Sequence, residues 1–264
     1  MTARTLAIPG ATVQVFPDPG HACAAAAGLI ARSIREGVAA RGGAVIGLAT
    51  GNTPLPVYDR LAALHRAGDL SFAEVSTYNL DEYYPIAPTD PRSYRAYMDR
   101  HLYGRVDLAA NRAHIFDGTV PEAFAAEHAA GFDRWIEAEG GLDLQLLGVG
   151  RNGHIGFNEP SDLRVDAALR LPSRPTGLHP TTVEDAAAEF GDATLVPPRA
   201  LTLGVAPILA ARSILVLAFG AKKAEILASA LQGPVTAGVP ASLLRTVAGR
   251  VTWMIDEAAA SRLG

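Results

Sequence analysis

Short, uninterrupted apolar runs recur along this 264-residue chain, separated by segments of helix length. Apolar runs without polar alternation are typical of parallel strands that are buried on both faces. Parallel neighbours need a long crossover, usually a helix, and such crossovers are right-handed. We therefore predict an α/β fold with a mostly parallel sheet flanked by helices. The predicted strands are Val13–Val15 (at a sheet edge), Ala44–Leu48, Val75–Leu80, Leu142–Val149, Ser213–Phe219 and Val251–Ile255, and the predicted helices are His21–Arg41, Pro54–Ala67, Pro91–Leu102, Pro121–Glu139, Lys222–Leu231 and Ala241–Thr246.

No internal repeat or long linker interrupts this alternation, so residues 1–264 are expected to form a single domain. One irregular segment, Ser161–Thr181, is rich in Pro and Arg. It follows the most polar loop of the chain. We expect residues 161–181 to form a small lid or flap over the functional site.

Composition excludes several classes of function. The net charge is −4 with no basic block, which argues against a nucleic-acid partner. A single cysteine, Cys23, excludes an internal disulfide and any multi-thiolate metal site, and favours a reducing compartment. The N-terminal segment lacks a signal-peptide pattern, and no apolar stretch reaches the roughly 18–20 residues that span a bilayer. We expect a cytoplasmic protein without a membrane partner.

Ligands of open parallel sheets bind at the carboxyl ends of the strands, so the loops after the apolar runs are candidate sites. The first loop is Thr50-Gly51-Asn52-Thr53-Pro54. Its peptide N–H groups at a helix start could cradle a phosphate. An ordinary helix cap, with Thr53 capping and Pro54 in the first helical position, explains the same residues equally well.

The second candidate is the acidic pair Asp81-Glu82, within Asn79–Tyr84. Adjacent acids at a strand end can divide their roles, one facing the cleft and the other pairing elsewhere. A carboxylate of this kind is a suitable general base for a proton next to a carbonyl. A solvated acidic turn is the alternative.

The third and strongest candidate is Leu147–Pro160, with four glycines within nine residues. Glycines let the backbone approach a ligand closely, and the loop brings His154 and Glu159 together. Without a cysteine or second histidine at ligand spacing, the pair favours proton transfer over metal binding. A fourth loop places Lys222 and Lys223 at a helix start, where the dipole disfavours cations. At least one of them is expected to meet an anion, unless both are solvated.

In this order the loops resemble the glucosamine-6-phosphate deaminase family, from about Ala44 to Ala258. The motifs that carry the resemblance are TGNTP, NLDEYY, SYRAYM, GVGRNGHIGFNEP, VPPRALTLGV and the Lys223 segment. The resemblance implies a Rossmann-like parallel sheet with a lid. It also implies conversion of an amino-sugar 6-phosphate and water to a ketose 6-phosphate and ammonia, with no metal or organic cofactor.

The resemblance also implies roles for individual residues. Asp81 would move a proton from C2 to C1 of the sugar. His154 would assist ring opening, supported by Glu159 and by Asn152 in an Asn–His–Glu relay. The residues that would hold the phosphate are Thr50, Gly51, Asn52, Thr53 and Lys223.

The chain departs from the family pattern at several positions. Many relatives have Asp where Asn152 stands, so their acid–His–acid relay becomes Asn–His–Glu here. We interpret this difference as tuning of the relay. In Thr181–Asp192 no arginine stands where the better-known enzymes grip the phosphate, and Glu189 is the nearest counterpart. An arginine from elsewhere, such as Arg174 or Arg199, could compensate, or the substrate could be a different amino-sugar phosphate or lack the phosphate.

Regulation is expected to differ as well. The chain ends at Gly264 without the longer tail of the hexameric members, and the serine pair expected after NEP is reduced to Ser161-Asp162. We therefore expect no allosteric activation by an acetylated sugar phosphate, and a monomer or small homo-oligomer.

Two other functions fit the same resemblance. 6-Phosphogluconolactonases share the fold and a similar Gly–His loop, but Glu159 within FNEP and the DEYY sequence favour the deaminase. Related folds also serve as sugar-phosphate sensors in transcription repressors. A sensor would not need Asp81, His154 and Glu159 together, and the chain has no basic helix-turn-helix segment.

Overall fold

A computed structural model describes residues 3–264. Its main sheet has eight strands in the order β1-β2-β11-β10-β7-β3-β4-β6. Only β1 runs antiparallel to its neighbour, and every other pairing is parallel. The bounds are β1 (Arg4–Ile8), β2 (Ala11–Phe16), β3 (Ala44–Leu48), β4 (Val75–Asn79), β6 (Ala113–His114), β7 (Leu144–Gly148), β10 (Ile214–Ala218) and β11 (Val251–Asp256).

The central strands are buried on both faces, as their unbroken apolar runs predict. Every residue of β3, β4 and β10 is buried. From β3 the chain proceeds to β4 and β6 on one side, and from β7 it proceeds to β10 and β11 on the other. The order therefore reverses between β3 and β7, the position at which open α/β sheets bind their ligands.

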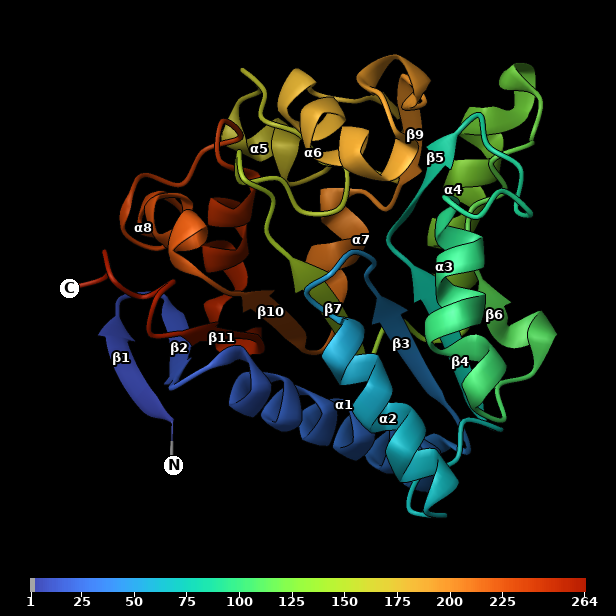
Figure 1. Cartoon of the computed structure of the whole chain (residues 1–264), viewed down its shortest axis with the longest axis horizontal. Helices are drawn as coiled ribbons and strands as arrows, with labels where there is room; N and C mark the ends of the chain where they lie inside the picture. The colour runs from blue at the N-terminus through green and yellow to red at the C-terminus, as the bar shows by residue number, and fades with distance from the viewer. Residues whose placement is uncertain (1–2) are drawn as a thin grey trace.

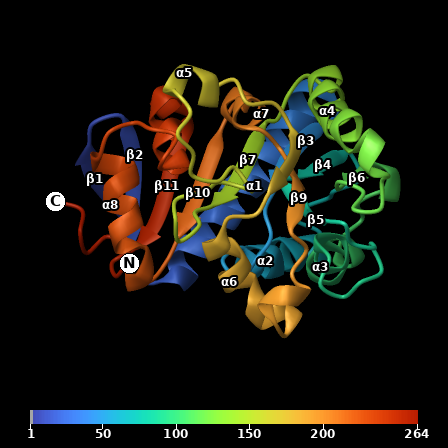
Figure 2. The ribbon, with the colours of Figure 1, turned by 90° about the horizontal axis from the view of Figure 1, so that it is seen from above.

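Helices cover the two faces of this sheet. In the view from above, α2 lies on one side of the strands, whereas α4 and α7 lie on the other (Figure 2), and α1 packs against α2. The helix bounds are α1 (Pro19–Arg41), α2 (Leu55–Arg66), α3 (Tyr94–His101), α4 (Glu122–Ala138), α5 (Val165–Ala168), α6 (Pro180–Phe190), α7 (Val205–Ala210) and α8 (Ala224–Gln232). The 3₁₀ segments are η1 (Tyr103–Arg105), η2 (Ala110–Arg112), η3 (Ala193–Leu195), η4 (Ala221–Lys223) and η5 (Pro240–Arg250). None of the helices among the described residues is long and apolar enough to cross a membrane.

A second, three-stranded sheet lies beyond the carboxyl ends of the main strands (Figure 1). It consists of β5 (Asp81–Tyr84), β9 (Arg199–Thr202) and β8 (Arg174–Gly177), in the order β5-β9-β8 with antiparallel pairing. Helix α6 packs beside it around a small separate apolar cluster. The expected lid segment, residues 161–181, contributes α5 and β8 to this upper layer. Whether it opens and closes stays a prediction.

The structure corrects several details of the predicted elements. The Val13–Val15 strand is not at an edge, because β1 pairs along the outer side of β2. The segment Ala241–Thr246 lies in the 3₁₀ stretch η5, which is kinked at Val247, rather than in an α-helix. Helix α3 begins at Tyr94 instead of Pro91, because the Ser93 side chain caps it by accepting from the peptide N–H of Ala96.

Candidate active site

A cleft lies where the loops after β3, β7 and β10 meet the beginning of β5. Its outer part has a volume of about 630 Å³, and its inner part has about 160 Å³. Both parts are lined by Gly51, Asn52, Thr53, Tyr94, Gly150, His154 and Phe157. The predicted Thr50–Thr53 loop and the glycine-rich loop therefore form facing walls of one cleft.

The Thr50–Thr53 loop is not an ordinary helix cap. Helix α2 begins at Leu55, its cap position is Pro54, and no side chain caps it. The prediction that Thr53 would cap the helix is therefore wrong. Among the described residues, the peptide N–H groups of Gly51, Asn52 and Thr53 donate to no protein acceptor. Their loop leads into a helix N-terminus, an arrangement suited to an anion.

A tyrosine that sequence reasoning left without a role holds this loop from α3. The Tyr97 hydroxyl donates to the Gly51 carbonyl oxygen at 2.6 Å. Gly51 has a φ of 93°, a backbone conformation that favours glycine. The loop geometry thus depends on a contact with a helix that lies 46 residues further along the chain.

The adjacent acids Asp81 and Glu82 have different surroundings. Asp81 lines the inner cleft, whereas Glu82 accepts hydrogen bonds from the peptide N–H groups of Tyr83, Tyr94 and Arg95. Glu82 therefore holds the start of α3. Burial, together with the nearby Glu82 charge, raises the pKa of Asp81 well above its usual range. The solvated acidic turn considered as an alternative is excluded, because both side chains are buried.

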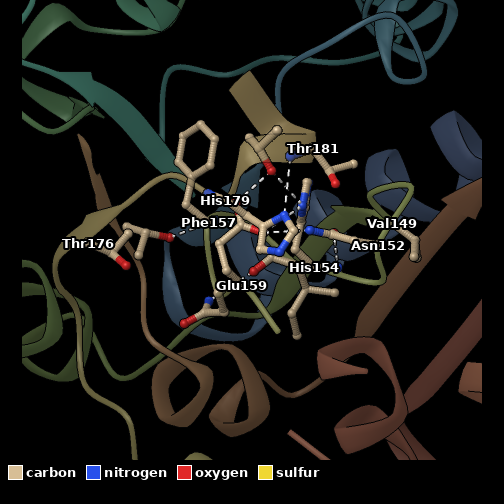
Figure 3. Close-up of polar contacts among 12 residues, drawn as sticks. Val149, Asn152, His154, Phe157, Glu159, Thr176, His179 and Thr181 are labelled. Carbon is tan, nitrogen blue, oxygen red and sulfur yellow. Dashed lines mark hydrogen bonds and ion pairs between the residues drawn. The ribbon is translucent and has the colours of Figure 1, made fainter. Parts of the chain in front are cut away.

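His154, Asn152 and Glu159 form a connected group in the glycine-rich loop (Figure 3). His154 Nδ1 lies 3.2 Å from Glu159 Oε2. The Asn152 amide Nδ2–H donates to the same Glu159 oxygen at 2.9 Å, and Asn152 Oδ1 accepts from the His154 peptide N–H at 3.1 Å. Of these three residues His154 lines the cleft, and Asn152 and Glu159 hold it from behind.

This arrangement keeps Glu159 ionised. Burial alone would raise the pKa of Glu159, but the hydrogen bond and charge of His154 and the hydrogen bonds from Thr182 and Asn152 outweigh it and lower the pKa to about 2. A carboxylate facing Nδ1 favours a proton on that nitrogen, which leaves a lone pair on Nε2. The imidazole is therefore oriented to accept a proton on its other ring nitrogen.

Gly150 makes room for the imidazole. A Cβ on Gly150 would lie 2.3 Å from both Cε1 and Nε2 of His154, much closer than real contacts. The glycine at this position is therefore required by the ring, which packs directly against the backbone.

Two residues beyond the glycine-rich loop complete the surroundings of Glu159. The Thr182 hydroxyl donates to Glu159 Oε1 at 2.6 Å, and the His179 peptide N–H donates to the same oxygen at 3.4 Å. Both belong to the start of α6. Sequence reasoning missed them because no local motif relates this helix to the loop.

Lys223 lines the outer cleft, and that it meets an anion there stays a prediction. Its Nζ donates to the Val149 carbonyl oxygen at 2.8 Å, and burial lowers its pKa. Arg174 and Arg199, the proposed compensating arginines, do not line the cleft: Arg174 donates to Asn158 Oδ1, and Arg199 pairs with Glu122. Other cationic and acidic side chains line the outer cleft instead, namely Arg92, Arg100, Arg151, Asp185 and Glu189, and His101 lies beside them.

No group of three or more His, Cys, Asp or Glu side chains within residues 3–264 is arranged to hold a metal ion. The cleft itself presents a buried carboxyl, an imidazole backed by a carboxylate, an amine and peptide N–H groups.

Known proteins resemble this chain over most of its length. Residues 17–253 match the family model described as glucosamine-6-phosphate isomerases/6-phosphogluconolactonase. The chain is 42% identical to a glucosamine-6-phosphate deaminase from Rhodopirellula baltica, over 95% of each chain. Among solved structures, a monomeric glucosamine-6-phosphate deaminase superposes with a TM-score of 0.87 at 35% identity, covering 95% of this chain and 99% of that one.

The likeness to solved 6-phosphogluconolactonases is one of fold. The 6-phosphogluconolactonase from Trypanosoma brucei superposes with a TM-score of 0.75 at 21% identity, over 96% of this chain and 99% of that one. The predicted resemblance is therefore confirmed, and the chain belongs to the glucosamine-6-phosphate deaminase family.

Proposed function

We propose that this enzyme converts glucosamine 6-phosphate and water to fructose 6-phosphate and ammonia. The observation that carries the proposal is one cleft that combines a buried carboxyl, Asp81, with an imidazole, His154, held by Glu159. The reaction needs two separate proton-transfer groups, since the ring must open before the C2 proton becomes acidic. Family membership supports the substrate class.

Ring opening falls to His154. With Nδ1–H directed to Glu159, the lone pair on Nε2 can accept the proton of the anomeric hydroxyl, and the resulting imidazolium can return a proton to the ring oxygen. Glu159, which remains ionised, stabilises the imidazolium. Asn152 holds both partners and supplies no proton of its own.

Isomerisation falls to Asp81. Its carboxylate would take the proton from C2 of the open sugar and deliver it to C1, while a proton passes from the amine to the C1 oxygen, which leaves an imine at C2 and a hydroxyl at C1. Water then adds to C2, the C–N bond breaks, and ammonia leaves. A raised pKa suits this role, because a more basic carboxylate takes a proton from carbon more readily.

The phosphate is proposed to bind at the Gly51–Thr53 loop and Lys223. The three peptide N–H groups of the loop have no protein acceptor among the described residues, and Lys223 adds a cation to the same cleft. Anchoring the remote phosphate supplies binding energy that orients the reacting carbons. Asp185 and Glu189 of α6 also line the outer cleft, and like charge disfavours placing the dianion against these two carboxylates.

The substrate is tested with glucosamine, galactosamine and mannosamine, each with and without a 6-phosphate, scored for ammonia and for ketose. We expect ammonia and ketose in equal amounts from glucosamine 6-phosphate. Binding without turnover of any of these sugars would favour a sensor, and hydrolysis of 6-phosphogluconolactone in place of ammonia release would favour a lactonase.

The role of Asp81 is tested with Asp81→Asn, an isosteric change. We expect it to abolish exchange of the C2 proton with solvent deuterium and to leave substrate affinity nearly unchanged. Deuterium incorporation at the wild-type rate would remove Asp81 from the proton-transfer role.

We also propose that the enzyme acts in the cytoplasm as a monomer or small homo-oligomer, with residues 161–181 as a lid. The solved deaminase that it resembles is monomeric. Light scattering measures the oligomeric state. Closure of the lid is measured by hydrogen exchange, in which residues 161–181 should become protected when substrate binds.

A further inference from the structure

We propose that Thr182 is a positioning residue, whose hydroxyl fixes the Glu159 carboxylate against His154 and thereby ties the ring-opening pair to helix α6. The inference rests on the proposed function of this cleft. It assigns a role to a residue that lies outside the glycine-rich loop.

The contacts around Glu159 show why one hydroxyl matters. Glu159 Oε2 faces His154 Nδ1 at 3.2 Å and receives the Asn152 amide. The other oxygen, Oε1, receives Thr182 Oγ1–H at 2.6 Å and the more distant His179 N–H at 3.4 Å. Thr182 therefore makes the shorter of the two contacts that prevent the carboxylate from rotating away from the imidazole.

The same hydroxyl also approaches the imidazole. Thr182 Oγ1 lies 3.3 Å from His154 Nδ1. While its proton goes to Glu159, the oxygen keeps lone pairs that can accept from Nδ1–H. Thr182 is buried, with 6% of its surface exposed, so water does not readily replace it. A buried hydrogen bond to a charged group is stronger than a neutral one.

Helix α6 connects this contact to the substrate cleft. Thr182, Asp185, Ala186 and Glu189 all line the outer cleft and recur at helical spacing. Thr182 is the residue of this row that also contacts the Glu159–His154 pair. The position of α6, which forms one wall of the cleft, thus affects the orientation of Glu159 and His154.

The test compares Thr182→Val, which keeps the shape and removes the hydroxyl, with Thr182→Ser, which restores it. Thr181→Val is the matched control, because the neighbouring hydroxyl makes no hydrogen bond among the described residues and does not line the cleft. With glucosamine 6-phosphate we expect Thr182→Val to lower kcat about 10-fold, the size typical of losing one strong hydrogen bond, with KM changed less than twofold. Thr182→Ser should recover most of kcat.

A double-mutant cycle with Glu159 distinguishes a positioning role of Thr182 from a general effect on folding. In a Glu159→Gln background, Thr182→Val should lower kcat less than twofold further, since its target is already altered. If Thr182→Val lowered kcat by the same factor in the Glu159→Gln background as in the wild type, the proposal would be overturned. A wild-type kcat in Thr182→Val alone would also overturn it.

A second readout does not depend on turnover. The His154 Nδ1 proton should give a downfield NMR resonance, assigned by its loss in His154→Gln. We expect this resonance in the wild type, Thr182→Ser and Thr181→Val, and its broadening by solvent exchange in Thr182→Val. An unchanged resonance in Thr182→Val would overturn the positioning role. A wild type without ammonia release would instead overturn the proposed function.

Discussion

Replacing Gly150 by alanine tests whether the position of the His154 ring controls catalysis. The new Cβ would lie 2.3 Å from Cε1 and Nε2 of the imidazole. Carbon atoms in contact normally stay about 3.5–4.0 Å apart, so the ring has to move by about 1 Å or more. Gly150 has no positive φ, so alanine adopts the same backbone without strain.

The size of the effect follows from this displacement. Misplacing a reacting group by about 1 Å costs on the order of 100-fold in rate, which corresponds to about 2.7 kcal/mol of transition-state stabilisation. The shift would also lengthen the 3.2 Å contact between His154 Nδ1 and Glu159. We expect kcat of Gly150→Ala for ammonia release from glucosamine 6-phosphate to fall by roughly two orders of magnitude.

A double-mutant cycle separates this explanation from a general disturbance of the loop. In a His154→Ala background the ring is absent, so Gly150→Ala should have little further effect on kcat. Calorimetric unfolding of each variant checks that the fold persists. If Gly150→Ala kept kcat within threefold of the wild type, or lost 100-fold equally in both backgrounds, the argument that the imidazole occupies this space would be refuted.

Three further variants test the other contacts of the site. His154→Gln should reduce turnover of the cyclic sugar more than that of an open-chain analogue, and an equal loss on both would contradict the ring-opening role. Tyr97→Phe removes the 2.6 Å hydrogen bond to Gly51 and should raise KM several-fold for the phosphorylated sugar but leave kcat within twofold, as steady-state kinetics would show. Glu159→Gln should lower the free energy of unfolding by up to about 3 kcal/mol at pH 7. Folding lowers the pKa of Glu159 from 4.5 to about 2, so its ionised carboxylate stabilises the folded state fully only at pH values above 4.5. That difference from the wild type should shrink as the pH falls from about 4.5 towards 2, and urea unfolding that shows a constant difference would contradict it.

The central sheet could be predicted from the sequence because its signal is local. The run Ala44–Leu48 is apolar throughout, and β3 has the same bounds. The upper layer could not be predicted in this way. Strands β8 and β9 have four residues each, too few for a period to be recognised, and α6 packs on a small separate apolar cluster.

The site shows the same limit. His154 and Glu159 lie in one loop, so their proximity could be read from the sequence. The different roles of Asp81 and Glu82 arise because the peptide N–H groups of α3 bind Glu82. The orientation of Glu159 depends on Thr182. These partners lie 12 to 23 residues away along the chain, and folding alone brings them together.

The two functional carboxyl groups differ because of what surrounds them. Asp81 is buried beside a second acid, which raises its pKa, whereas Glu159 is held by an imidazole, an amide and a hydroxyl, and its pKa is lowered to about 2. A pair of acids whose pKa values are pushed apart can divide proton transfer and charge stabilisation between them. The more basic group, Asp81, is suited to exchange a proton with carbon. Glu159 stays charged across the working pH range, so it serves best by holding the imidazole, which lines the cleft.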